Sequence, residues 1–218
     1  EKNSALLAEN VIHGDVASAN KWKIKADPVD DSGATIYKSF TSVIGNMKNG
    51  ATVDLDITLS DVQVEVSGGD NAGLACGTMD ENTSLAVNLS SSSLDVSGKS
   101  NAGVFVGKMS ADATLSIDKC DTLTSVNISA NNAGGLVGSA ENAEINVGEG
   151  VTLTMTGSVT GSVTAGGLFG SYTYSKANEK TFDISKFSGM EMALACSSGD
   201  TADSAAVGSV FGVLTNSA

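Results

Sequence analysis

The chain has 218 residues, of which 41% are apolar and 17% are charged, a balance that excludes an intrinsically disordered segment. Its formal net charge is -13 and its twelve basic residues are all lysines, so the arginine forks that read phosphates and base edges are missing. Nucleic acid is therefore excluded as an expected partner. No run reaches the roughly 18 apolar residues of a membrane span, so we expect no membrane insertion within this segment.

Residues 1–38 are the least regular part of the chain. Trp22, Ile24 and the run 35–37 are expected to form strands, and the stretch 27–33, which holds the only proline, is expected to be a turn-rich excursion. Two interpretations of this segment remain open. It is either a degenerate first coil of the repeats that follow or a cap that covers the open strand edges of their first coil.

A seven-residue motif recurs through residues 39–218, which we expect to form one repeat region. Its clear copies occupy residues 71–77, 101–107, 132–138 and 164–170, and weaker copies occupy residues 39–45 and 206–212. Every copy closes on a glycine: Gly45, Gly77, Gly107, Gly138, Gly170 and Gly212. The copies are about 31 residues apart except for the last, whose longer spacing indicates an insertion.

Two short apolar runs lie between successive motifs. The first pair is Val53, Leu55 and Ile57, then Val62, Val64 and Val66. Alternation with a period of two predicts strands with one buried face, and the 25 glycines and single proline agree with a chain of strands and turns. We therefore expect an all-β fold, a parallel β-helix (β-solenoid) with about 31 residues and three short strands per coil.

The aligned motifs give each position a physical role, if each motif is one strand with a turn at both ends. The position before the closing glycine predicts an interior column: Ile44, Cys76, Val106, Val137, Phe169 and Phe211. A second interior column is predicted four places earlier: Phe40, Ala72, Ala102, Ala133, Ala165 and Val207. The closing glycines predict a corner that needs positive φ or a close backbone approach. Asn71, Asn101 and Asn132 predict left-handed turn residues and a ladder of stacked amides.

One further apolar column lies two places before the closing glycine. It consists of Val43, Ala75, Phe105, Leu136, Leu168 and Val210. Strict alternation would point these side chains away from the interior. Either the strand bends at the closing glycine so that both columns turn inward, or the column is an exposed stripe that another domain, subunit or receptor covers. We favour the bend, because six stacked apolar side chains in water would promote aggregation.

The copies at residues 133–138 and 165–170, with their Ala-Gly-Gly-Leu-Val-Gly and Ala-Gly-Gly-Leu-Phe-Gly sequences, resemble the GLUG repeat of bacterial surface proteins. The copies at 73–77 and 103–107 depart from its Gly-Gly-Leu core. The resemblance implies a right-handed parallel β-helix in a secreted or wall-attached, adhesin-like bacterial protein. It also implies the partners: neighbouring repeats or domains of a longer parent chain, and a host or surface protein or a glycan receptor. The export signal is then expected outside this segment.

Residues that could carry catalysis are scarce. His13 is the only histidine, no serine or cysteine lies in a nucleophile elbow, and the three cysteines (Cys76, Cys120 and Cys196) show no metal spacing and are expected to be buried. The acidic clusters within residues 27–31, 54–56 and 200–203 match no calcium loop. We therefore expect no metal, no cofactor and no enzymatic activity.

These observations favour a non-enzymatic solenoid that serves as a stalk or an adhesive surface. The alternative is a glycan-binding or glycan-processing β-helix. The β-helical lyases and glycosidases rely on arginine and histidine, which are absent or nearly absent from this chain.

A ligand contact, if present, is expected in the lengthened last coil, because insertions in repeat proteins form loops on a binding face. This segment carries Tyr172, Tyr174, Lys176 and Lys180. Paired tyrosines can stack on sugars, or they can cover an irregular corner of the core. We favour the second interpretation.

Overall fold

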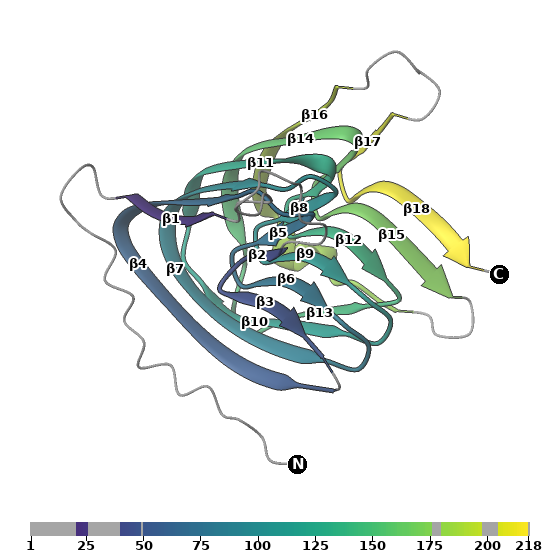
Figure 1. The fold of residues 1–218 in the computed structure, drawn as a ribbon, viewed down its shortest axis with the longest axis horizontal. Helices are drawn as coiled ribbons and strands as arrows, with labels where there is room; N and C mark the ends of the chain where they lie inside the picture. Colours follow the sequence, from purple (N-terminus) through teal and green to yellow (C-terminus); the bar gives the residue numbers. More distant parts are fainter. Residues whose placement is uncertain (1–20, 26–39, 49, 176–179, 198–204, 218) are drawn as a thin grey trace, which may run out of the picture.

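The structure is a computed structural model that describes residues 21–25, 40–48, 50–175, 180–197 and 205–217. Within them the chain is an all-β parallel solenoid whose coils repeat about every 32 residues, so the predicted fold class is confirmed (Figure 1). The helical structure in these ranges is one short 3-10 helix, η1 (Ile184–Phe187). None of it is long and apolar enough to cross a membrane.

Three strands per coil are confirmed, although their lengths are unequal. The first coil holds β1 (Lys21–Lys25), β2 (Phe40–Thr41) and β3 (Ile44–Met47), and the second holds β4 (Thr52–Ser67), β5 (Asn71–Gly73) and β6 (Cys76–Met79). The third holds β7 (Ser84–Ser97), β8 (Asn101–Gly103) and β9 (Val106–Met109), and the fourth holds β10 (Thr114–Cys120), β11 (Leu123–Gly134) and β12 (Val137–Glu141). The fifth holds β13 (Glu144–Val147), β14 (Thr154–Gly166) and β15 (Phe169–Ser175), and the last holds β16 (Gly189–Cys196), β17 (Ala206–Gly208) and β18 (Phe211–Ser217).

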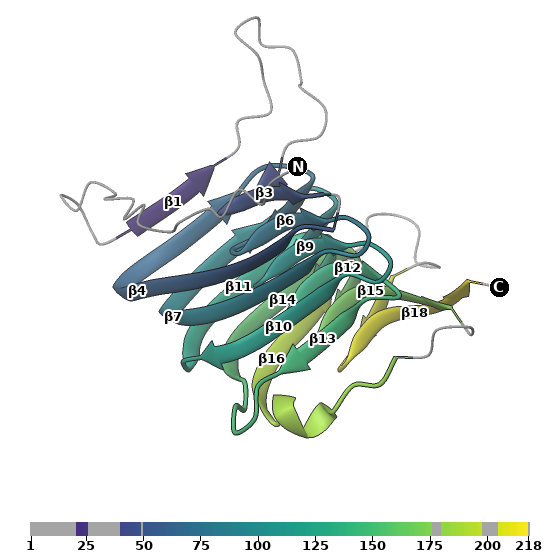
Figure 2. The same ribbon diagram turned by 90° about the horizontal axis from the view of Figure 1, so that it is seen from below.

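The coils stack with the same residues of each repeat side by side. The strand pairs are parallel and form one twelve-stranded sheet and one six-stranded sheet. The six-stranded sheet has the order β18-β15-β12-β9-β6-β3. Asn71 pairs with Asn101, Ala72 with Ala102 and Gly73 with Gly103. In Figure 1 the chain runs clockwise from β4 through β5 to β6, and Figure 2 shows that later coils lie deeper in that view. The solenoid is therefore right-handed.

The seven-residue motif is a corner and not a single strand. In the second coil β5 ends at Gly73, Leu74 and Ala75 form a bend, and β6 begins at Cys76. The expectation of one strand with a turn at each end is therefore wrong. The turn lies inside the motif, and the closing glycine belongs to the strand that follows it.

Close approach, and not positive φ, explains four of the closing glycines: Gly107, Gly138, Gly170 and Gly212. The glycines with positive φ in the described residues are others: Gly50, Gly68, Gly69, Gly150 and Gly157. A Cβ atom on Gly138 would lie 2.4 Å from the amide nitrogen of Ala102 and 2.7 Å from the carbonyl oxygen of Gly107. A Cβ atom on Gly107 would lie 2.6 Å from the amide nitrogen of Ala72. The second strand of each corner thus touches the backbone of the preceding coil, and no side chain fits between them.

Both predicted interior columns are buried in the inner coils. Cys76, Val106, Val137 and Phe169 are buried, and so are the alanines Ala72, Ala102, Ala133 and Ala165. The ends differ from the prediction. Thr41, and not Phe40, pairs with Ala72, because two residues separate Thr41 from Ile44 where three separate Ala72 from Cys76. Val207, at the other end, is 51% exposed.

The further apolar column also faces the core. Ala75, Phe105 and Leu136 are fully buried and Leu168 is 4% exposed, whereas the end members are half-buried Val210 and Val43, which is 37% exposed. The interpretation as an exposed partner stripe is therefore wrong for the four inner members. Alternation breaks at the bend inside the motif, so that neighbours such as Ala75 and Cys76 both point inward.

This burial predicts unequal effects of one substitution at two positions of the column. Leu168→Ser should cost about 2 to 4 kcal/mol, because it leaves a cavity and buries a hydroxyl, and should lower Tm by roughly 5 to 15 °C. Val43→Ser, in the same column but half open to solvent, should cost less than about 1 kcal/mol. Thermal unfolding followed by circular dichroism measures both. Equal, small shifts would show that the column does not pack in the core.

Candidate functional site

Tyr172 is a core residue and not a sugar-stacking platform. It is 2% exposed, and its hydroxyl donates a hydrogen bond of 2.7 Å to the carbonyl oxygen of Ala143. Its ring lies 5.0 Å from Phe169, 5.4 Å from Phe182 and 5.5 Å from Phe211. Burial, with a smaller contribution from Glu144, raises the pKa of Tyr172 to about 12. Its assignment as a ligand contact is therefore wrong, and the favoured interpretation, an aromatic cover for the lengthened coil, is confirmed.

The other three predicted contacts have different outcomes. Tyr174 is half-buried and packs against the same core. Lys176 lies outside the described residues. The ammonium of Lys180 lies 3.6 Å from an Asp112 carboxylate oxygen and 3.8 Å from one of Glu144. The structure thus brings Lys180 together with two carboxylates that the sequence analysis did not single out.

These two carboxylates lie at a turn where successive coils stack. Asn82, Asp112 and Asn142 have positive φ of 56°, 57° and 44°. Gly50, with φ of 68°, holds this position in the second coil. The side-chain amide of Asn142 donates to Asp112 at 3.5 Å, and Glu144 begins β13. The signal that could have revealed this column is the recurrence of Gly, Asn and Asp at one repeat spacing, because these residues tolerate the left-handed conformation.

A hollow of about 260 Å³ lies next to the start of the last coil. Its walls include Ile145, Val147, Asp183, Lys186 and Phe187. Hydrogen bonds from Ser185 lower the pKa of Asp183, and the Lys186 ammonium donates to the carbonyl oxygen of Gly148 at 3.3 Å. This hollow offers one carboxylate and one lysine, both already paired with neighbouring groups.

An amide ladder runs along the corner of the solenoid. Asn101 donates to Asn71 at 2.7 Å, Asn132 donates to Asn101 at 2.9 Å, and the Thr164 hydroxyl donates to Asn132 at 3.0 Å. The predicted ladder is confirmed. The predicted left-handed conformation is wrong, since these asparagines lie in β5, β8 and β11. Asn101 and Thr164 are buried and Asn71 and Asn132 are half-buried, so the ladder is partly shielded from water.

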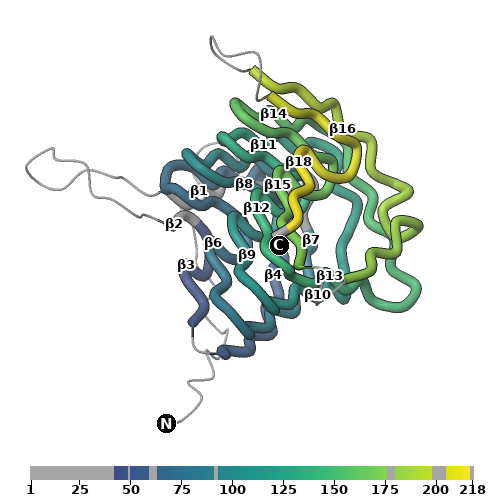
Figure 3. The backbone as a smooth tube through the Cα atoms, turned by 90° about the vertical axis from the view of Figure 1, so that its right-hand side faces the viewer, coloured from purple at the N-terminus to yellow at the C-terminus, as the bar shows by residue number. Residues whose placement is uncertain are grey.

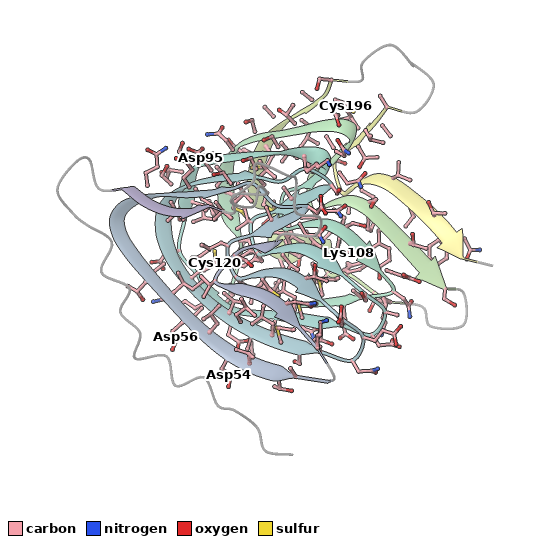
Figure 4. All side chains as sticks on the ribbon, viewed as in Figure 1. Asp54, Asp56, Asp95, Lys108, Cys120 and Cys196 are labelled. Atoms are coloured by element: carbon pink, nitrogen blue, oxygen red, sulfur yellow. The ribbon has the colours of Figure 1, made fainter. Side chains whose placement is uncertain are left out.

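The acidic side chains are dispersed over the outer face. Asp54 and Asp56 project from the outside of β4, far from Asp95 on the opposite part of the coil (Figure 4). Asn88 donates to Asp56, and Gln63 and Asn127 each donate to Asp95 at 2.7 Å. In the described ranges no three His, Cys, Asp or Glu side chains are grouped to hold a metal ion. The predicted clusters within 27–31 and 200–203 lie outside these ranges.

The three cysteines are free thiols. Cys76 is buried as expected, whereas Cys120 and Cys196 are only half-buried, and Figure 4 shows these two well apart. Burial raises the pKa of both Cys76 and Cys120 to about 12. Neither thiol is therefore poised as a nucleophile, because the thiolate is the reactive form.

Comparison with known proteins gives no relative: no family model, no curated protein and no solved structure matches the chain.

The pKa of Tyr172 predicts how stability changes in alkali. The folded-state pKa is about 12 against an ordinary value of 10.0, so the unfolded chain loses its proton first and stability falls as the pH rises from 10 towards 12. Tyr172→Phe keeps the ring, loses one hydrogen bond worth about 1 kcal/mol at neutral pH, and removes this alkaline loss. Urea unfolding from pH 8 to 11.5 should therefore give a flatter profile for the variant. Parallel profiles would mean that Tyr172 ionises equally in both states.

Proposed function

We propose that this segment is a non-enzymatic structural solenoid, a stalk or adhesive surface of an exported bacterial surface protein. The observation that carries the proposal is the amide ladder within in-register coils. Asn71, Asn101, Asn132 and Thr164 link four successive coils through side chains, in addition to the backbone pairing. A column of this kind transmits load along the axis without a specific ligand.

The resemblance to GLUG repeats supports the location. We place the protein outside the cell, at a bacterial surface or wall, with neighbouring repeats of a parent chain and a protein or glycan receptor as partners. The acidic balance, a net charge of -13, suits a repetitive strand protein that must remain soluble.

Single-molecule stretching of the whole chain between its termini tests the mechanical role. We expect stepwise lengthening by about 110 Å per coil, since about 32 residues extend by roughly 3.5 Å each. Asn101→Ala should lower the rupture force of the middle coils and cost about 1 to 3 kcal/mol, because the half-buried Asn71 loses its donor and the half-buried Asn132 loses its acceptor. Asn127→Ala, on the exposed outer face, is the control and should change little. A chain that extends without steps would contradict a role in transmitting force along the stack.

A second candidate, glycan binding or processing, is favoured by one observation. Asp112 and Glu144 both lie close to Lys180, and a pair of carboxyl groups, one as general acid and the other as base or nucleophile, is what most glycosidases use on a glycosidic bond. Ion pairing within the cluster has a simpler role, because it fastens the end of the insertion to two earlier coils. We therefore assign the cluster a structural role.

An activity assay separates the two functions. Incubation with acidic polysaccharides should release no reducing ends or unsaturated products, and calcium chelator should leave Tm unchanged. Lys180→Met should lower Tm by a few degrees at most, because the cluster is half open to solvent. Product that forms with the parent chain and disappears in Glu144→Gln would establish the second candidate, and a large drop of Tm in chelator would reveal a metal site.

A further inference from the structure

The two ends of the solenoid are complementary, and the last coil leaves interior columns uncovered. Val207 and Leu214 are 51% and 54% exposed, although the residues before them in the same columns, Ala165 and Tyr172, are buried. Met192 and Leu194 of the last coil are half-buried. In the same columns of the third coil, Leu94 and Val96 are fully buried. An apolar groove of about 200 Å³ opens beside β16, and its lining includes Leu168, Met190 and Val210.

Both ends also offer free strand edges. In the part of the chain that the structure describes, β16 and β17 pair on one side only, with β14, and β18 pairs only with β15. At the other end, within the same described ranges, β1 pairs only with β4, β2 only with β5 and β3 only with β6. Figure 3 shows these first and last coils at opposite ends of the stack. Unpaired edges are templates for addition of another strand.

The register of the first coil matches that of the last. Trp22 and Ile24 pair with Val64 and Val66, whose columns continue through the stack to Met192 and Leu194. A second copy shifted along the axis would therefore place its β1 beside β16 in parallel, with Trp22 over Met192 and Ile24 over Leu194. The same shift places β2 beside β17 and β3 beside β18.

Charge favours the same arrangement. β1 carries Lys21, Lys23 and Lys25 at the register positions of Gln63, Glu65 and Ser67, and these are three of the twelve lysines of a chain with net charge -13. In the shifted arrangement Lys21 lies over the exposed Glu191 of β16, and Lys23 and Lys25 lie over the small Ala193 and Ala195. No like charges meet along this pair of strands.

We propose that the chain associates head to tail with a second copy of itself, the coil β1-β2-β3 of one molecule continuing the coil β16-β17-β18 of its neighbour. The two contacting surfaces are different, so the contact is heterologous and growth along the axis is open-ended. This assembly does not depend on the proposed stalk role and would extend it into a filament.

Sedimentation velocity over a concentration series tests the proposal. The parent chain should form longer oligomers as its concentration rises and shorter ones at high salt, because salt screens the attraction between the lysines of β1 and Glu191. Lys21→Glu with Lys23→Glu and Lys25→Glu should block one end, and Val207→Asp with Leu214→Asp should block the other. Each set should weaken association at least tenfold. Lys99→Glu and Val163→Asp, at exposed positions on the sides of the stack, are the matched controls and should associate like the parent.

A mixing experiment decides the geometry. Each blocked variant alone should be monomeric, and an equimolar mixture should stop at a dimer, because one intact first coil meets one intact last coil. Circular dichroism of each variant verifies its fold, and adding Glu191→Lys to the triple glutamate variant should restore part of the association. A parent chain that stays monomeric at all concentrations would overturn the proposal, and so would dimers formed by either blocked variant alone.

Discussion

The structure depends on one constraint: each residue lies beside its own counterpart in the next coil, one strand spacing of about 4.8 Å away. A side chain at any position must therefore be compatible with copies of itself. Asparagine satisfies this condition because its amide both donates and accepts, and Asn71, Asn101 and Asn132 do so in sequence. Charged side chains do not, and where two acidic residues meet in register, as Glu65 and Asp95 do, Asp95 accepts hydrogen bonds from the amides of Gln63 and Asn127. In the same way Asn88 donates to Asp56.

The corner of each coil adds a second constraint, which acts on volume. Two short strands meet at the bend and touch through their backbones, so the positions that face each other accept only glycine. At Gly103 a Cβ atom would lie 2.5 Å from the carbonyl oxygen of Leu136, and at Gly134 it would lie 2.0 Å from that of Val137. The bend then turns two consecutive apolar residues inward, which places Phe105 and Val106 together in the core. The most regular motif of the sequence is therefore the tightest part of the fold.

The lengthened last coil meets these constraints differently. Where earlier coils place Met109 and Ala140, the fifth coil places Tyr172, and an aromatic cluster with Phe169, Phe182 and Phe211 fills the space next to the insertion. Lys180 fastens the far end of the insertion to Asp112 and Glu144. The core thus ends in aromatic rings, beyond which the columns are open to solvent.

The sequence by itself determined the repeat, its period, the strands and the parallel stack, because a fixed spacing of apolar and glycine positions has few other solutions. It also determined the amide ladder, since identical residues at one repeat spacing must meet. Three things were decided only by the tertiary structure. The motif became a corner, because backbone contact between coils replaces a side chain at its glycines. Tyr172 became buried, because Phe182 folds back over it from beyond the insertion. Asp112, Glu144 and Lys180 became neighbours, because Lys180, which follows the lengthened part of the chain, returns to the turns of two earlier coils.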